Sequence, residues 1–133
     1  MSGLVLKLRP SERIMINGAV IENGDRRTRL NVLTPNANVL RLRDAIHPDE
    51  ANTPVRRVCY IAQLLLAGEA DPEPARQQIS LGIEQLAQVF SDGESRINLQ
   101  EAKIHLAREN DYMALKFLRF LLPVEARLME AAS

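Results

Sequence analysis

Four arginines in the first third of the chain are spaced so that they could bind an anion together. Arg27 and Arg29 are two residues apart, and so are Arg41 and Arg43. Residues two apart in a β-strand point to the same side, so each pair would share one face. The guanidinium group is planar, permanently charged and well suited to bidentate contacts with phosphate. The chemistry that this pattern indicates is phosphate binding rather than catalysis.

The expected pairing of the two strands that carry these arginines strengthens this interpretation. If Val32 lies opposite Leu40, then Arg29 lies opposite Arg43, and like charges that face each other across a sheet are destabilising. A bound anion such as phosphate would relieve that repulsion. The alternative is that the arginines form ion pairs with neighbouring aspartates or with acidic residues of the C-terminal part of the chain.

The other candidates for chemistry are weaker. His105 shares a helix face with Glu101 and Glu109, a spacing that could hold a metal ion. Because no second cluster of ligands exists, a solvated charged face is the better interpretation. Cys59 is the single cysteine and is typical of a buried small apolar side chain. The sequence has neither a glycine-rich phosphate loop nor a nucleophile motif, so we expect no enzyme, no metal and no cofactor.

Composition and charge place the chain among folded proteins. It has 133 residues, of which 46% are hydrophobic and 26% are charged, close to the average for globular domains. Residues 1–46 contain eight basic and four acidic groups, whereas residues 47–133 contain nine and thirteen. No apolar run approaches the ~18 residues that a membrane helix needs, and the N-terminus lacks a signal-peptide pattern. We expect a folded protein whose N-terminal part is basic.

Residues 1–46 have the alternating pattern of short β-strands, the first of them over residues 4–8. The pair Asn17-Gly18 separates two apolar runs and is a strong signal of a two-residue hairpin loop. Such a loop predicts three cross-strand pairs: Ile16 with Ala19, Ile14 with Ile21, and Arg13 with Glu22. Two further strands are expected over 27–33 and 39–43. The prediction for residues 1–46 is a small antiparallel β meander or barrel.

Residues 47–133 have the periodicity of about four helices. We expect helices over 54–67, 71–90, about 95–108, and from 111 onward. Thr53 followed by Pro54 is a strong signal for the first of these, because threonine caps a helix and proline suits its first turn. Pro123 is expected to kink or restart the last helix. The predicted fold class is α+β, with a β lobe of residues 1–46 and a helical lobe of residues 47–133.

The segment 115–122 in the last helix is apolar nearly all round, which implies burial on more than one side. Either it lies at the centre of the helical lobe or part of it docks a partner. We favour the centre, because large exposed apolar patches are uncommon on monomers. If a partner docks here, four side chains are expected to contact it: Leu115, Phe117, Phe120 and Leu121.

Five segments of the chain together resemble the bacterial FlbT family of flagellum biosynthesis repressors. They are 8–21 (LRPSERIMINGAVI), 23–27 (NGDRR), 40–46 (LRLRDAI), 51–57 (ANTPVRR) and 110–116 (NDYMALK). The resemblance implies a cytoplasmic, non-enzymatic, post-transcriptional regulator of flagellin. Members of the family associate with the 5′ untranslated region of flagellin mRNA and promote its degradation, together with a small helical companion, FlaF. In some relatives the effect is activating.

A second resemblance covers only residues 4–46. The strand order and the motif ERIMI at 12–16 are similar to the carbon storage regulator family, small β proteins that bind mRNA leaders. The first strand and the basic end of the last strand contact RNA there, which implies a role for Lys7 and Arg9 together with Arg41 and Arg43. Two chains interlock in that family, which implies a homodimer through the β lobe.

Two hypotheses of different classes follow. In the first, the β lobe binds RNA phosphates through Lys7, Arg9, Arg27, Arg29, Arg41 and Arg43. All five aromatic residues lie in the helical lobe, so base stacking on the sheet is not expected. In the second, the protein is a chaperone-like adaptor whose helical lobe binds FlaF or flagellin, with indirect control of the mRNA.

Overall fold

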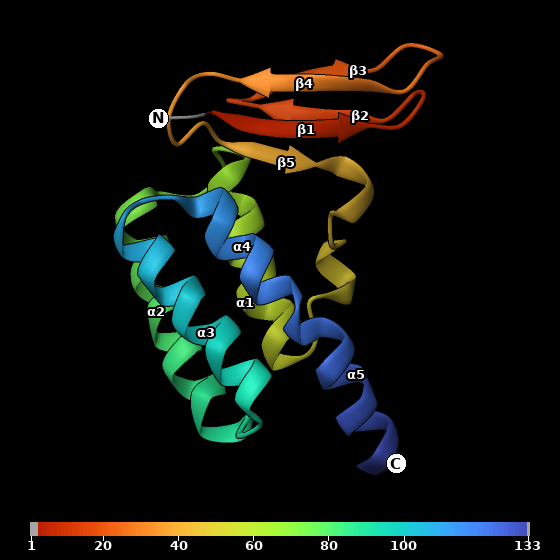
Figure 1. The fold of residues 1–133 in the computed structure, drawn as a ribbon. Coiled ribbons are helices and arrows are strands. Elements are labelled where there is room, and N and C mark those ends of the chain that lie inside the picture. Colours follow the sequence, from red (N-terminus) through yellow and green to blue (C-terminus); the bar gives the residue numbers. More distant parts are fainter. Residues whose placement is uncertain (1–2, 133) are drawn as a thin grey trace.

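The structure, a computed structural model, describes residues 3–132 and consists of a strand part stacked on a helical part (Figure 1). The strands are β1 (Leu4–Leu8), β2 (Arg13–Ile16), β3 (Ala19–Glu22), β4 (Thr28–Val32) and β5 (Val39–Arg41). Two short 3-10 turns, η1 (Leu42–Asp44) and η2 (Pro48–Glu50), lead to the helices. These are α1 (Pro54–Leu66), α2 (Pro72–Val89), α3 (Gly93–Ala107), α4 (Asp111–Arg119) and α5 (Leu121–Ala132). The predicted α+β fold class is confirmed; below, β1–β5 are called the β lobe and α1–α5 the helical lobe.

The predicted hairpin between β2 and β3 is confirmed, including its register. Ile16 pairs with Ala19, and Arg13 pairs with Glu22. Asn17 and Gly18 both have positive φ angles, 49° and 86°, as a two-residue type I′ loop requires. The Asn17 side chain also accepts a hydrogen bond from the backbone N–H of Asn38 at 2.9 Å, which ties the loop to the chain entering β5.

The predicted pairing of the last two strands, β4 with β5, is wrong: β4 pairs with β1, and β5 pairs with β2. Val32 therefore lies opposite Leu4, and Arg29 lies opposite Lys7 instead of Arg43. The β1–β4 ribbon covers the three-stranded sheet β3–β2–β5, and the apolar faces of the two layers bury each other's side chains, as in a small sandwich. No closed barrel forms among the described strands.

The strand predicted over 39–43 is shorter than expected. It ends at Arg41, and the turn η1 begins at Leu42. Val39 and Leu40 are both buried, although they point to opposite sides of the strand. Val39 belongs to the core between the two sheets, and Leu40 belongs to the core of the helical lobe. The last strand is thus covered on both faces, and Arg43 leaves the sheet.

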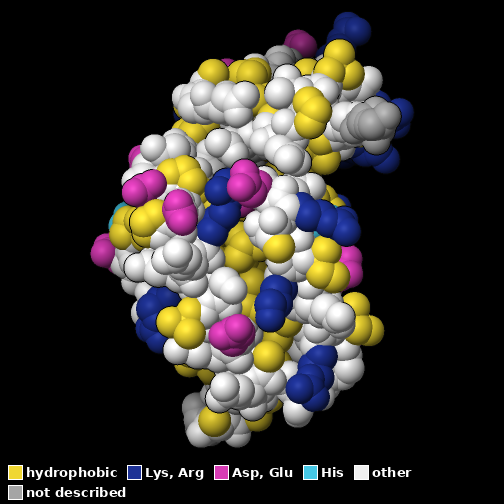
Figure 2. All heavy atoms as spheres, turned by 90° about the vertical axis from the view of Figure 1, so that its left-hand side faces the viewer, with side chains coloured by type: hydrophobic (Ala, Val, Ile, Leu, Met, Phe, Trp, Pro, Cys, Tyr) yellow, Lys and Arg dark blue, Asp and Glu magenta, His cyan; other side chains and the backbone are white. Residues whose placement is uncertain are grey.

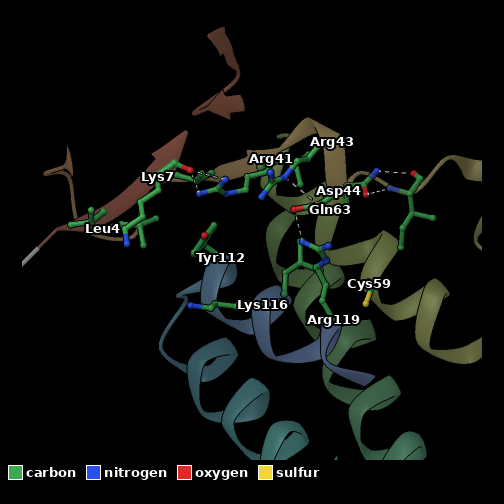
Figure 3. Close-up of a pocket in the computed structure, with 15 residues that line it drawn as sticks. Leu4, Lys7, Arg41, Arg43, Asp44, Cys59, Gln63, Tyr112, Lys116 and Arg119 are labelled. Carbon is green, nitrogen blue, oxygen red and sulfur yellow. Dashed lines mark hydrogen bonds and ion pairs between the residues drawn. The ribbon is translucent and has the colours of Figure 1, made fainter. Parts of the chain in front are cut away.

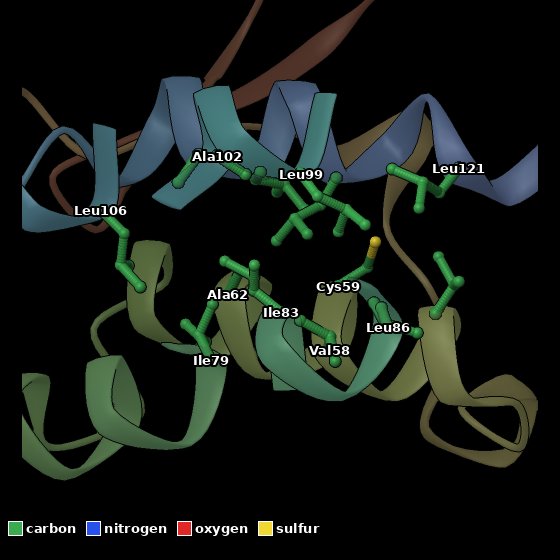
Figure 4. Packing of buried hydrophobic residues seen from close by; sticks show 14 of the residues in the cluster. Val58, Cys59, Ala62, Ile79, Ile83, Leu86, Leu99, Ala102, Leu106 and Leu121 are labelled. Carbon is green, nitrogen blue, oxygen red and sulfur yellow. The ribbon is translucent and has the colours of Figure 1, made fainter. Parts of the chain in front are cut away.

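Each lobe has its own hydrophobic core. The β lobe buries five side chains between its two sheets: Leu6, Leu8, Ile14, Val32 and Val39. The helical lobe buries a larger cluster in which α1 and α2 face α3 and α4 (Figure 4). Tyr112, at the start of α4, packs against both clusters, so it connects the two lobes.

Helix α1 begins where its capping signal predicts. The Thr53 hydroxyl accepts a hydrogen bond from the N–H of Arg56, and Pro54 occupies the first turn of α1. Glu125 of α5 also accepts hydrogen bonds from the Thr53 hydroxyl and from the N–H of Val55 at 2.9 Å. This buried carboxylate therefore fixes α5 to the start of α1. No helix within residues 3–132 is long and apolar enough to cross a membrane.

The break in the last predicted helix lies earlier than expected. Helix α4 ends at Arg119 and α5 begins at Leu121, so Pro123 falls in the first turn of α5 and not at the break. Proline is tolerated there because the first N–H groups of a helix have no intrahelical partner. Helix α4 packs between α1 and α3, with Leu118 fully buried, so the segment occupies the centre of the helical lobe.

Candidate nucleic-acid interface

The outer face of the β1–β4 ribbon is basic. Alternation along β1 points Leu6 and Leu8 into the core and Lys7 outward. Lys7 lies directly opposite Arg29 of β4, and both side chains are exposed. Like charges in directly opposed positions destabilise a sheet. The sequence predicted a pair of opposed like charges between Arg29 and Arg43. The structure contains such a pair, but Lys7 takes the place of Arg43.

Five of the six predicted cations line one shallow hollow of about 410 Å³ on this face. Its wall consists of Lys7, Leu8, Arg9, Arg27, Thr28, Arg29 and Arg43, and we call it the ribbon hollow. No carboxylate lines it. Within residues 3–132, Lys7, Arg9, Arg27 and Arg29 form no ion pair. Their charges are therefore available to an external anion.

The surface shows the same division of charge. On the face drawn in Figure 2, basic and acidic side chains are interspersed over the helical lobe. Most of the visible surface of the β lobe above it is apolar or uncharged, and basic side chains lie at one margin. Residues 1–46 carry eight basic and four acidic groups and residues 47–133 carry nine and thirteen, so the attraction for a polyanion is stronger on the β lobe.

Arg41 has a different environment from the other five cations. Its side chain is only 16% exposed, and Nη1 lies 2.9 Å from Oε2 of Glu12. Both Nη atoms also donate hydrogen bonds to the backbone carbonyl of Lys7 at 3.2 Å. Arg41 is thus neutralised within the chain and positions the edge of β1. Arg43 keeps looser contacts, since its Nε lies 3.7 Å from both Glu12 and Asp44.

Glu12 is a structural residue that the sequence did not point to. Its side chain is 3% exposed, and Oε1 accepts a hydrogen bond from the backbone N–H of Arg9 at 2.9 Å. One carboxylate thereby closes the turn between β1 and β2 and holds Arg41. An acidic residue just before a hairpin was visible in the sequence, but its partner Arg41 lies 29 residues further along the chain.

A second concavity of about 490 Å³ lies between the two lobes (Figure 3). We call it the inter-lobe pocket. Its charged lining comprises Lys7, Arg41, Arg43, Asp44, Lys116 and Arg119. Tyr112 is the single aromatic residue of this lining, and its ring rises from the start of α4 toward β1 (Figure 3). Five cations thus face one carboxylate across the junction.

That carboxylate, Asp44, links the lobes. Its Oδ2 lies 2.8 Å from Nη1 of Arg119 on α4. Partial burial alone would raise the pKa of Asp44, but the hydrogen bond and charge of Arg119, helped by Arg43 and Arg41, outweigh it and hold the pKa below its usual value. Asp44 is therefore ionised at neutral pH, and the ion pair fastens η1 to α4.

The four residues considered for partner binding are divided between the core and the surface. Leu115 and Leu121 are buried, 8% and 0% exposed, so they stabilise the helical lobe itself. Phe120 is 51% exposed. Phe117 is half-buried, and its ring stacks on His105 with centroids 5.4 Å apart. Only the two phenylalanines therefore reach the surface.

The residues considered for a metal ion do not form a site. His105 Nε2 lies 3.9 Å from Glu101, but Glu109 turns to Arg76, 4.0 Å away. In the described part of the chain, no three His, Cys, Asp or Glu side chains come together as metal ligands would. Cys59 is buried, and this desolvation raises the pKa of its thiol to about 12.

The chain is similar to proteins of one flagellar family. The family model described as "Flagellar protein FlbT" matches residues 4–129. A "Probable flagellum biosynthesis repressor protein FlbT" from a Caulobacter species is 33% identical over 122 residues, which cover 92% of each chain. A protein of the same name from Mesorhizobium japonicum is 32% identical over 126 residues, 95% of this chain and 84% of that protein.

The "Flagellum biosynthesis repressor protein FlbT" of Caulobacter vibrioides is 30% identical over 122 residues, 92% of this chain and 86% of that protein. No solved structure matches the chain. A family model that spans nearly all of the sequence, together with full-length relatives, identifies the chain: it belongs to the FlbT family of flagellar proteins.

Proposed function

We propose that this protein is a cytoplasmic repressor of flagellum biosynthesis that binds the 5′ untranslated region of flagellin mRNA and promotes its degradation. The names of its relatives support the repressor role. The ribbon hollow supports direct RNA binding, since it gathers five cations and no carboxylate on one face. In this proposal the β lobe binds RNA and the helical lobe binds protein partners.

The number of cations in the hollow determines how strongly RNA binding should depend on salt concentration. A protein that neutralises phosphates of a single strand loses affinity with salt, with a log–log slope of about −0.7 per phosphate. Five contacts, one for each cation of the hollow, predict a slope of about −3.5. Arg41 is not counted because it does not line the hollow and Glu12 holds it at 2.9 Å, whereas Arg43 lines the hollow, is 40% exposed and has only ion-pair contacts of 3.7 Å.

The test is a binding titration of the flagellin leader at several salt concentrations. Replacing Arg27 and Arg29 by alanine removes two unpaired cations of the hollow and should reduce the slope by about 1.4. The matched control replaces Arg57 and Arg96, two exposed arginines of α1 and α3, and loses the same net charge. Equal salt slopes for the two variants, or no binding of the leader by the unaltered protein, would show that RNA does not bind to this face.

A second function, as an adaptor for a FlaF-type regulator or for flagellin, is favoured by one observation. Phe120 is 51% exposed and its ring lies 6.2 Å from that of Phe117, so two aromatic side chains adjoin at the end of α4. Phe120→Asp should abolish copurification with either partner while the fold is kept. Val89→Asp, at a site on α2 that is 67% exposed, is the control and should leave copurification unchanged.

A further inference from the structure

The inter-lobe pocket adjoins the ribbon hollow. Lys7 and Arg43 line both concavities, so these two side chains form their common wall. An RNA backbone whose phosphates contact the cations of the hollow therefore reaches the opening of the inter-lobe pocket. The cations that it meets next are Lys116 and Arg119 of α4, on the helical lobe.

The pocket keeps surplus positive charge after its internal ion pairs are counted. Asp44 is occupied by Arg119 at 2.8 Å, and Arg41 is occupied by Glu12 at 2.9 Å. Lys7 and Lys116 have no carboxylate partner among residues 3–132. An ammonium group offers three hydrogen-bond donors and no acceptor. Two unpaired ammonium groups in one concavity make it receptive to a phosphate.

Tyr112 adds a flat apolar surface beside these charges. Its side chain is half-buried between the two cores, and its hydroxyl makes no hydrogen bond within the described chain. A nucleobase stacked on such a ring strengthens the binding of single-stranded RNA. The sheet itself has no aromatic residue, so the helical lobe supplies the one ring that faces the basic strands (Figure 3).

We propose that the inter-lobe pocket holds one unstacked nucleotide of the bound RNA, with its base on Tyr112 and its phosphate between Lys7 and Lys116. This inference rests on the proposed function and extends it to base recognition. The pocket volume of about 490 Å³ falls in the ~300–1,000 Å³ of known ligand pockets. A base within a duplex cannot enter, so the site selects single-stranded RNA.

The absence of tryptophan allows a direct optical test. The chain has two tyrosines, so Tyr60→Phe leaves Tyr112 as the only reporter of tyrosine fluorescence. Single-stranded flagellin-leader RNA should quench this fluorescence, and the same sequence as a duplex should not. If the leader binds in a gel-shift assay without quenching, the pocket proposal fails and the proposed function stands. If the leader does not bind at all, the proposed function fails.

Free uridine monophosphate serves as the second probe in the same assay. Because a mononucleotide lacks the contacts of the ribbon hollow, we expect it to quench Tyr112 only at much higher concentration than the leader RNA does. Equal concentrations for half-maximal quenching would overturn the inference, since they would assign the pocket to a free nucleotide rather than to a nucleotide of an RNA strand.

Variants separate stacking from charge. Tyr112→Phe should keep the affinity for single-stranded leader RNA, and Tyr112→Leu should lower it at least about fivefold. Lys116→Gln alters an exposed side chain, so it tests the site without endangering the fold, and should reduce the salt slope by about 0.7. Lys103→Gln, at an exposed lysine of α3, is the matched control. Equal slopes for the two lysine variants would overturn the inference.

Discussion

Replacing Glu12 by glutamine changes the charge of a buried group while its shape is almost kept. In the native protein Oε1 accepts a hydrogen bond from the N–H of Arg9, and Oε2 faces Nη1 of Arg41, both at 2.9 Å. The amide oxygen of glutamine can still accept from Arg9. Its NH₂ group then faces the guanidinium group of Arg41, and two hydrogen-bond donors cannot pair. The variant therefore loses the charged hydrogen bond to Arg41 and keeps the hydrogen bond to Arg9 that closes the turn.

The exposure and remaining hydrogen bonds of Arg41 determine how much stability the variant should lose. A hydrogen bond to a charged group contributes about 1.5–3 kcal/mol to the free energy of unfolding. Arg41 remains 16% exposed and keeps its hydrogen bonds to the carbonyl of Lys7, which places the cost in the lower half of that range. We expect Glu12→Gln to lower the free energy of unfolding by about 2 kcal/mol.

The same lobe provides a matched control. Arg13 and Glu22 form an ion pair at 2.8 Å, but their side chains are 66% and 55% exposed, and exposed pairs contribute about 0–1 kcal/mol. Urea unfolding of Glu12→Gln and Glu22→Gln compares the two pairs at the same change of charge. If the two variants lose equal stability, the buried pair has no special structural role and the reasoning is refuted.

Three further predictions follow from buried or closely packed groups. Burial raises the pKa of Cys59 to about 12, so a thiol reagent at neutral pH should label it only after unfolding; rapid labelling of the native protein would contradict this. The pKa of Asp44 is lower in the folded protein than its ordinary value of 3.8, so the ion pair with Arg119 contributes its full stability above pH 3.8. That contribution is lost as the pH falls through the lower pKa of the folded state. Melting between pH 2 and 5 should therefore show a steeper loss for the native protein than for Arg119→Met, and equal pH profiles would exclude this contribution. A Cβ at Gly82 would lie 2.5 Å from a methyl group of Val58, so we expect Gly82→Ala to lower the melting temperature. Overpacking costs about 1–3 kcal/mol, which exceeds the ~1 kcal/mol that alanine gains over glycine in helix propensity. An unchanged or higher melting temperature would show that α1 and α2 can move apart to accept the methyl group.

Local signals in the sequence predicted local structure well. The register of the hairpin followed from Asn17-Gly18 because a two-residue loop leaves no freedom in how the flanking strands pair. The partner of β4 could not be predicted in the same way. Alternation of apolar residues fits a pairing with β1 as well as with β5, and only the packing of the two layers, which places Val32 inside, decides between them.

The candidate site was predicted by residue type rather than by geometry. Outward-facing cations on strands were visible as an alternation, and Arg27 and Arg29 line the hollow although the assumed register was wrong. The neutralisation of Arg41 by Glu12 was not visible, since ion pairs between distant residues depend on tertiary structure. The position of Tyr112 opposite the strands depends likewise on how one lobe sits on the other.

The two hydrophobic cores differ greatly in size, and this has a consequence for how the molecule opens. Five buried side chains between two short sheets are too few to sustain an independent unit. The strands rely on Leu40 and Tyr112, which anchor them to the larger core. Backbone amides of β3, whose four residues are all exposed, should exchange with deuterium first and those of α1 last, with the strands detaching before the helices melt.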